Sequence, residues 1–125
     1  MKLLLDTHVA LWWLGGIETI SDEARAAIEG SENDVFLSAA SVWEAGVKVA
    51  TGRLRLDAPL VPSAREAGMV ELPVTWSHAE RAASLPPVHG DPFDRMLVAQ
   101  ALAEGLVLVT RDPAIKQYAV PTLSA

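Results

Sequence analysis

Short apolar runs alternate with helix-like segments along this chain, and that alternation constrains the fold more than any other feature. The first run is Lys2 to Asp6, and the last clear one is Leu106 to Val109. Continuous apolar runs of about four to eight residues are typical of strands buried on both faces. Strands that alternate with helices form a mostly parallel sheet with helices on both sides. The sequence therefore predicts an α/β fold.

Capping residues, glycines and prolines set the predicted boundaries. The predicted strands are residues 2–6, 35–38, 69–72 and 106–109, with a further short one around Val120. The predicted helices are 7–14, 21–30, 39 or 40 to 51, 59–68, 75–85 and 91–104, with a last short one starting at Asp112-Pro113. No repeat or linker interrupts this order, so we expect residues 1–125 to form a single domain.

Composition excludes several classes of protein. Half of the residues are hydrophobic (50%) and 21% are charged, as in globular proteins. No apolar run approaches the roughly 18 residues of a membrane span, so we expect a cytoplasmic protein without membrane contact. The absence of cysteine excludes disulfides, zinc–thiolate sites and thiol nucleophiles. The net charge of −6 argues against broad binding to a nucleic-acid backbone, but it suits a basic partner or a nuclease whose metal ions meet the phosphate.

Four acidic residues stand at positions that suit a ligand site: Asp6, Glu44, Asp94 and Asp112. Asp6 and Asp112 follow the first and last clear strands, and the crevice at the carboxyl ends of parallel strands is where open α/β sheets bind ligands. Glu44 and Asp94 lie in apolar helix patterns. Clustered carboxylates repel one another unless a cation lies among them, and ligand sets made only of oxygen favour Mg²⁺ or Mn²⁺.

Each acid also has a structural interpretation. Asp6 and Asp112 could cap helices, as Asp91 before Pro92 does in our prediction. Glu44 could be solvated on an outer face, and Asp94 could interact with the helix dipole in a first turn.

The order of these acids carries a resemblance to a known family. Leu3–His8 resembles the opening of PIN-domain nucleases, and Ser38–Glu44 resembles the segment with their second acid. Asp91–Ala101 resembles their third motif, and Leu106–Asp112 resembles the fourth. Within the family the chain is most similar to small bacterial toxins of VapC type, the ribonuclease halves of toxin–antitoxin pairs.

The resemblance implies a three-layer α/β/α sandwich and an Mg²⁺-dependent endoribonuclease, with Mn²⁺ as an alternative ion. Asp6, Glu44, Asp94 and Asp112 match the four acids of the family's active site, with Asp6 and Asp94 as the principal metal ligands. Asp94 is chosen over Asp91 because it aligns with the family's acid when Ala99–Ala101 is placed on the matching helix. By the same resemblance, Thr7 and Thr110 are hydroxyl groups near the site.

The resemblance also implies an RNA substrate, a homodimer and a cognate antitoxin. A basic side chain of the antitoxin could enter the acidic pocket and displace metal. The hydrophobic part of that interface would come from Val9, Leu11, Trp12 and Trp13, or from the helix with Trp43 and Val47. Arg95 and Arg111, each beside a proposed acid, would contact substrate phosphate or pair with carboxylates.

Three other functions remain open at this level. A receiver-type phosphotransfer domain shares the length and the acidic pocket, but Asp6 stands alone after the first strand and no lysine follows the late one. A haloacid-dehalogenase-like phosphatase would need a second acid two residues after Asp6. The sequence cannot distinguish a non-catalytic PIN-like binding module from an active nuclease. The three histidines, His8, His78 and His89, show no spacing that suggests a catalytic triad.

Overall fold

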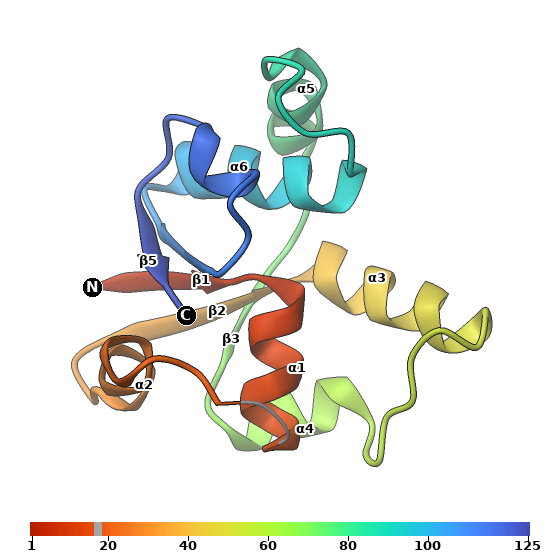
Figure 1. The fold of residues 1–125 in the computed structure, drawn as a ribbon, viewed down its shortest axis with the longest axis vertical. Coiled ribbons are helices and arrows are strands. Elements are labelled where there is room, and N and C mark those ends of the chain that lie inside the picture. The colour runs from red at the N-terminus through yellow and green to blue at the C-terminus, as the bar shows by residue number, and fades with distance from the viewer. Residues whose placement is uncertain (17–18) are drawn as a thin grey trace.

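The computed structural model describes residues 1–16 and 19–125, and its elements alternate as the sequence predicts (Figure 1). The strands are β1 (Lys2–Leu5), β2 (Asp34–Ser38), β3 (Val70–Leu72), β4 (Val107–Thr110) and β5 (Thr122–Ser124). The helices are α1 (Thr7–Gly15), α2 (Asp22–Glu29), α3 (Ala39–Ala50), α4 (Leu60–Glu66), α5 (Trp76–Ser84), α6 (Pro92–Glu104) and the 3-10 helix η1 (Ile115–Gln117). Within these described ranges, no helix is long and apolar enough to cross a membrane.

The strands form one parallel sheet with the order β3-β2-β1-β4-β5. From β1 the chain continues outward through β2 on one side and later through β4 on the other. The topological switch point therefore lies between β1 and β4, at the carboxyl ends of these strands. A receiver domain has the flavodoxin-like order 2-1-3-4-5 instead. The sheet order is thus evidence against the receiver-type alternative.

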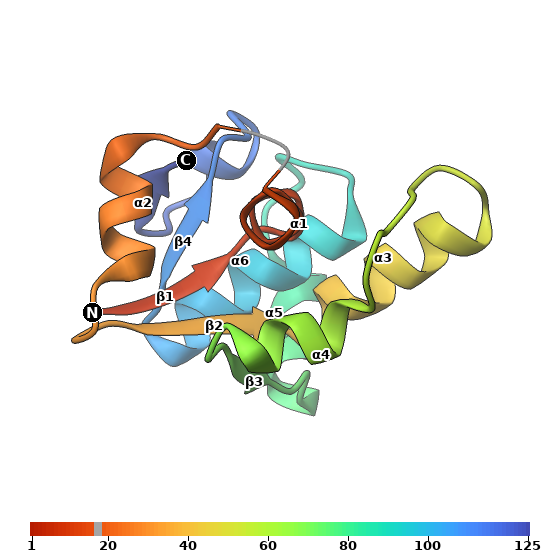
Figure 2. The same ribbon diagram turned by 90° about the horizontal axis from the view of Figure 1, so that it is seen from below.

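Side chains of β1 alternate between two hydrophobic cores. Leu3 and Leu5 pack with residues of α1, α2 and α4, whereas Leu4 packs with Leu97 and Val98 of α6. All five side chains are fully buried, and each contributes roughly 1.5–3 kcal/mol to stability by leaving water. Figures 1 and 2 show α1, α2 and α4 on one side of the sheet and α6 on the other, with α5 packed on α6. The predicted three-layer α/β/α architecture is confirmed.

The chain after β4 differs from the prediction. Asp112 does not begin a helix directly: its Oδ1 accepts a hydrogen bond from Ala114 N (2.8 Å), and residues 113 and 114 form a turn. Helical structure begins only at Ile115, as the single 3-10 turn η1. The last strand is β5 (Thr122–Ser124), two residues beyond the predicted position at Val120.

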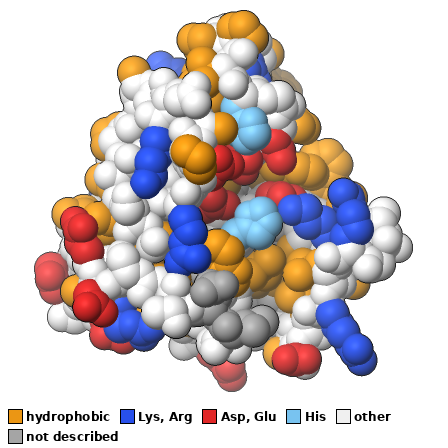
Figure 3. Space-filling view, in the orientation of Figure 1, with side chains coloured by type: hydrophobic (Ala, Val, Ile, Leu, Met, Phe, Trp, Pro, Cys, Tyr) orange, Lys and Arg blue, Asp and Glu red, His pale blue; other side chains and the backbone are white. Residues whose placement is uncertain are grey.

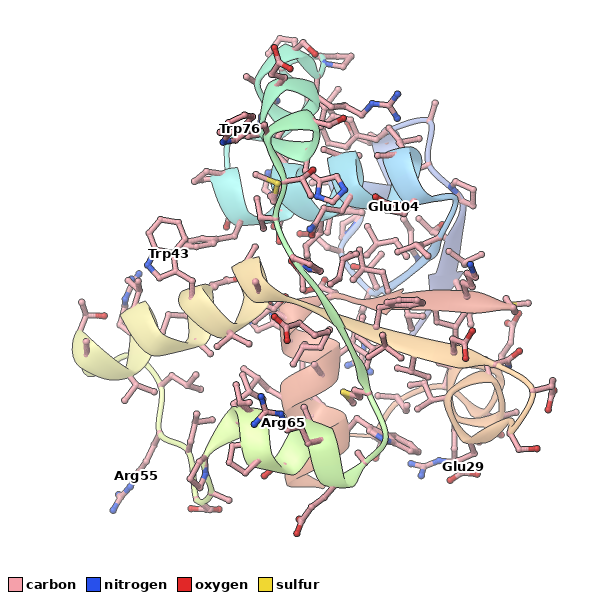
Figure 4. The ribbon with its side chains drawn as sticks, turned by 180° about the vertical axis from the view of Figure 1, so that it is seen from behind. Glu29, Trp43, Arg55, Arg65, Trp76 and Glu104 are labelled. Carbon is pink, nitrogen blue, oxygen red and sulfur yellow. The ribbon has the colours of Figure 1, made fainter. Side chains whose placement is uncertain are left out.

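The four tryptophans divide into two pairs. Trp12 and Trp13 pack against the core of the α1 side, with guanidinium groups of Arg111 and Arg25 over their rings. Val9 is fully buried, whereas Leu11, Trp12 and Trp13 are partly exposed, so only these three could contribute to the interface predicted on this helix. Trp43 on α3 and Trp76 on α5 are instead 68% and 92% exposed, and Figure 4 shows both on one edge of the molecule.

Candidate active site

Asp6 lies at the switch point of the sheet, directly after β1. Its Oδ1 accepts a hydrogen bond from His8 N (3.2 Å), which caps α1. Its Oδ2 accepts a hydrogen bond from Thr110 Oγ1 (2.7 Å) at the end of β4. The residue is 4% exposed. The helix-cap interpretation is therefore correct, and the same carboxylate also joins the ends of the two central strands.

Glu44 comes from α3, which begins where β2 ends. Ser38 Oγ caps this helix by accepting from Ala40 N (3.0 Å) and donates to Gln100 Oε1 of α6 (2.6 Å). The Glu44 carboxylate is buried at 2% exposure, so the interpretation as a solvated charge is wrong. Its Oε2 accepts a hydrogen bond from Lys48 Nζ (2.7 Å). Its Oε1 has no hydrogen-bond partner among residues 1–16 and 19–125.

Asp94 lies in the first turn of α6 and is buried. Asp91 is the cap of this helix, as predicted, because its Oδ1 accepts hydrogen bonds from Phe93 N (2.8 Å) and Asp94 N (3.3 Å). The Asp94 Oδ2 atom is 2.8 Å from His89 Nε2. The structure thus gives the two neighbouring acids different environments, with Asp91 at the helix end and Asp94 facing the centre.

His89 is the functional candidate that the sequence did not reveal. Its Nε2 lies 2.8 Å from Asp94 Oδ2 and 3.6 Å from Asp112 Oδ2. One ligand atom from each of these three residues falls within 4.8 Å of the others, which is close enough for a shared metal ion. Its position five residues before Asp94, in a Pro- and Gly-rich loop, was the only available signal. Asp112 joins this group from the segment that follows β4.

The electrostatics show that the acids share one region. Burial raises the pKa of Asp94 to about 6, helped by the negative charges of Asp6, Asp91 and Glu44 and opposed by the hydrogen bond with His89. Burial also raises the pKa of Asp6, but hydrogen bonds from His8 and Thr110 outweigh it and leave that pKa below its usual value. Figure 3 shows acidic side chains gathered in a hollow of the molecular surface, with histidine side chains at its edge.

Two predicted neighbours of the site have different roles. Thr110 contacts Asp6 directly, as expected for a hydroxyl near the site, and also accepts from Asp112 N (3.1 Å). The hydroxyl of Thr7 donates instead to Ser41 Oγ (2.8 Å), which joins α1 to α3. Thr7 therefore supports the packing of the helices that carry the acids.

Neither predicted arginine pairs with a proposed acid in the contacts of the described residues. Arg95 points away from the carboxylates and donates to backbone carbonyl groups before α6. Arg111 donates to Thr19 O (2.7 Å) and Ala125 O (3.3 Å) and lies over the ring of Trp12.

The donor set fits a divalent cation. A buried carboxylate oxygen without a partner, such as Glu44 Oε1, costs free energy unless a cation or a donor satisfies it. Burial and, to a smaller extent, the neighbouring negative charges raise the pKa of Asp94, and a bound cation would relieve both effects. Carboxylate oxygens are the ligands that Mg²⁺ and Mn²⁺ prefer. The hollow between β1, β4, α3 and α6 can therefore hold such an ion.

A parallel α/β sheet with an acidic centre at its switch point is the architecture of a nuclease family, and the sequence comparison identifies that family. The chain belongs to the PIN domain family, which it matches over residues 3–121. It is 31% identical over 122 residues to Ribonuclease VapC22 of Mycobacterium tuberculosis, a match that covers 95% of this chain and 93% of that protein. The resemblance to the VapC-type ribonucleases of the PIN family is confirmed.

Solved structures share the fold at low sequence identity. VapBC2 from Rickettsia felis, bound to a DNA fragment from its promoter, has a TM-score of 0.75 and 12% identity and covers all of this chain and 99% of its own. DNA-bound VapBC from Salmonella typhimurium has a TM-score of 0.65 and 17% identity, with 99% and 98% covered. VapBC-5 from Mycobacterium tuberculosis, from a family of toxin–antitoxin systems, has a TM-score of 0.60 and 18% identity, with 98% and 96% covered.

Proposed function

We propose that this protein is a metal-dependent endoribonuclease toxin in which Asp6, Glu44, Asp94 and Asp112 hold Mg²⁺ or Mn²⁺. The observation that carries the proposal is the cluster of three buried carboxylates, Asp6, Glu44 and Asp94, near the switch point, with Glu44 Oε1 left without a partner in the described structure. The sequence similarity to Ribonuclease VapC22 supports RNA as the substrate.

The residues of the proposed centre would have different roles. Asp6 and Asp94, from β1 and α6, would be the principal ligands, while Glu44 and Asp112 complete the centre. A bound divalent ion supplies a nucleophilic water near neutral pH and neutralises charge on the phosphate oxygens. Hydrogen bonds from His8 and Thr110 lower the pKa of Asp6, and the 2.7 Å bond from Thr110 also fixes the direction of the carboxylate. Lys48 donates a hydrogen bond to one oxygen of Glu44, and the other oxygen, which has no partner among the described residues, would be available to the ion.

Cleavage of single-stranded RNA by the purified protein tests this proposal. We expect cleavage in Mg²⁺ or Mn²⁺, loss of cleavage in EDTA, and recovery when the ion is restored. Asp6→Asn should abolish cleavage while its circular dichroism spectrum stays that of the wild type. Undiminished cleavage after thorough chelation would overturn the mechanism. A protein that binds RNA without cleaving it under any of these conditions would support the non-catalytic binding module instead.

We further propose that an antitoxin neutralises the protein and that it forms a homodimer. The VapBC-5 structure, a member of a toxin–antitoxin family, supports such a partner. A net charge of −6 and an acidic hollow favour a basic segment of that antitoxin. An almost wholly apolar groove of about 330 Å³ is lined by the exposed Trp43 and the partly buried Phe93 and offers a surface for the second copy.

Co-expression tests the antitoxin, and light scattering tests the dimer. The product of the adjacent small gene should form a stable complex with the protein and restore growth. Trp43→Glu should convert the dimer to a monomer if α3 forms the interface, whereas Trp76→Glu on α5 is the matched exposed control. A wild-type protein that is strictly monomeric would contradict the dimer without affecting the nuclease.

A further inference from the structure

The Arg95 guanidinium donates mainly to carbonyl groups of the segment that precedes α6. Its Nη2 donates to two carbonyl groups at distances of 2.8 and 2.9 Å, and its Nη1 donates to a third at 3.0 Å and lies 3.4 Å from a fourth. These acceptors are, in that order, Ala82 O, Leu85 O, Pro86 O and His89 O. Arg95 therefore joins the end of α5 and the following loop to the first turn of α6. This is the same turn that carries Asp94.

Tyr118 holds the same loop from the other side. Its hydroxyl oxygen accepts hydrogen bonds from His89 N (3.0 Å) and from Arg95 Nη1 (3.2 Å), and the hydroxyl lies 3.4 Å from His89 O. The Tyr118 ring is buried in the core beside α6, so this hydroxyl has a fixed position. Both polar groups of the His89 main chain are thus bound by Tyr118, and the carbonyl group also faces Arg95.

This restraint directs the His89 side chain to the acidic centre. With its main chain fixed, the imidazole extends toward the carboxylates, where Nε2 reaches Asp94 Oδ2 at 2.8 Å and Asp112 Oδ2 at 3.6 Å. In the tautomer protonated at Nε2, His89 donates a hydrogen bond to Asp94. Asp94 and Asp112 belong to different elements, and His89 is the group that lies between them.

We propose that Arg95 and Tyr118 are positioning residues of the metal centre, which hold the His89 imidazole where it orients Asp94 beside Asp112. The proposal rests on the proposed function, because it takes Asp94 and Asp112 as ligands of the ion. Partners that hydrogen-bond to metal ligands typically change metal affinity by about 10- to 100-fold. Arginine suits this role because its planar group presents five donors, whereas a lysine ammonium has three and cannot reach the same set of carbonyl groups.

Mn²⁺ binding measured by calorimetry tests the positioning without any RNA. We expect His89→Gln to weaken Mn²⁺ binding by about tenfold or more. Arg95→Lys and Tyr118→Phe should also weaken it, by no more than His89→Gln does. Arg81→Lys is the control, because this arginine lies exposed on α5 and its side chain makes no hydrogen bond with residues 1–16 or 19–125. Adding Tyr118→Phe to His89→Gln should weaken binding no further than His89→Gln alone, since both changes act through one imidazole.

The His89 ring itself provides a second measurement that needs neither metal nor substrate. In nitrogen-15 spectra of the metal-free wild type at pH 8, we expect His89 to show one tautomer, protonated at Nε2. In Tyr118→Phe, which removes only a hydroxyl group, and in Arg95→Lys, the ring should show a mixture of tautomers. Wild-type ring spectra and wild-type Mn²⁺ affinity in both variants would overturn the proposal. The proposal would also be overturned if Tyr118→Phe lowered the Mn²⁺ affinity of the His89→Gln variant as much as it lowers that of the wild type.

The metal-dependent nuclease activity and the positioning of His89 can be disproved separately. A wild-type protein that neither binds Mn²⁺ nor cleaves RNA would contradict the proposed function, and the ring spectra would still decide whether Arg95 and Tyr118 place the imidazole. A wild-type protein that binds Mn²⁺ and cleaves RNA, with both activities unchanged in Tyr118→Phe, would contradict only the positioning.

Discussion

Thr110 donates a 2.7 Å hydrogen bond to Asp6 across 104 residues of sequence. The two residues stand at the ends of neighbouring parallel strands, and both are buried. The same hydroxyl oxygen accepts from Asp112 N (3.1 Å), so one threonine contacts two of the four proposed acids. This pair connects the stability of the sheet to the geometry of the site.

Removing the Thr110 hydroxyl should therefore affect stability and activity together. Thr110→Val keeps the side-chain shape but leaves a buried carboxylate oxygen of Asp6 and the Asp112 amide without their partner. We expect a loss of about 1–3 kcal/mol in the free energy of unfolding, measured by urea denaturation, and slower RNA cleavage. Thr122→Val on β5 is the matched control, because the Thr122 side chain makes no hydrogen bond with the described residues. Equal effects of the two substitutions would contradict a special role for Thr110.

Neutralising Asp94 should stabilise the metal-free protein. Its pKa in the folded state is about 6, above the usual value of 3.8, so the folded state binds its proton more tightly than the unfolded state does. The ionised form therefore destabilises the fold above pH 6, and that penalty disappears as the pH falls from 6 to 4. Asp94→Asn should raise the free energy of unfolding by about 1–3 kcal/mol at pH 7.5 in EDTA, with little change near pH 4.

Asp22→Asn controls for the general effect of removing one negative charge. Asp22 is exposed in the first turn of α2, where an acid interacts favourably with the helix dipole. This substitution should leave stability unchanged or lower it by a few tenths of a kcal/mol. A gain as large as that of Asp94→Asn would show that overall charge, and not the local cluster, is responsible.

Substitutions of the two acids at the start of α6 should have different effects on RNA cleavage. Asp91→Asn preserves a good helix cap, so we expect nearly wild-type cleavage and stability. Asp94→Asn removes a proposed ligand, and cleavage should fall by about a hundredfold or more, beyond the range for indirect partners of a metal. An inactive Asp91→Asn with a fully active Asp94→Asn would reverse the assignment.

The affinity for Mn²⁺ should depend on pH through Asp94. Cation binding needs the ionised carboxylate, and protons compete with the ion below the pKa of about 6. We expect the dissociation constant to be steady above pH 7 and to rise as the pH falls below 6, measured by calorimetry in a non-chelating buffer. A pH profile of Asp94→Asn that shows the same rise at the same pH would exclude Asp94 as its source.

Local sequence signals predicted most of the fold. The Ser21 cap, the Asp91-Pro92 start and Gly105, which adopts a positive φ of 67° after α6, all mark true helix ends. They succeeded because a cap satisfies backbone groups within a few residues of itself. The prediction at Asp112-Pro113 failed because a carboxylate that binds an amide two residues ahead forms a turn whether or not a helix follows.

The candidate site was only partly predictable. Strand ends and helix patterns indicated Asp6, Glu44, Asp94 and Asp112, and the structure brings all four to one region. The role of His89 depends on its contact with Asp112, which lies 23 positions later on another element, and no local pattern encodes that contact. The burial of Glu44 and the exposure of Trp43, its neighbour in sequence, likewise follow from how α3 packs against α6.

The sheet order has a consequence for synthesis on the ribosome. The central strand β1 is made first, and one of its two neighbours, β4, is made almost last. Asp6 therefore lacks its partner Thr110, and Asp94 lacks its neighbour Asp112, until nearly the whole polypeptide has emerged. A nascent or prematurely terminated chain contains the early acids without an assembled centre. Because the proposed metal centre needs all four acids, we expect RNA cleavage only after β4 and β5 have joined the sheet.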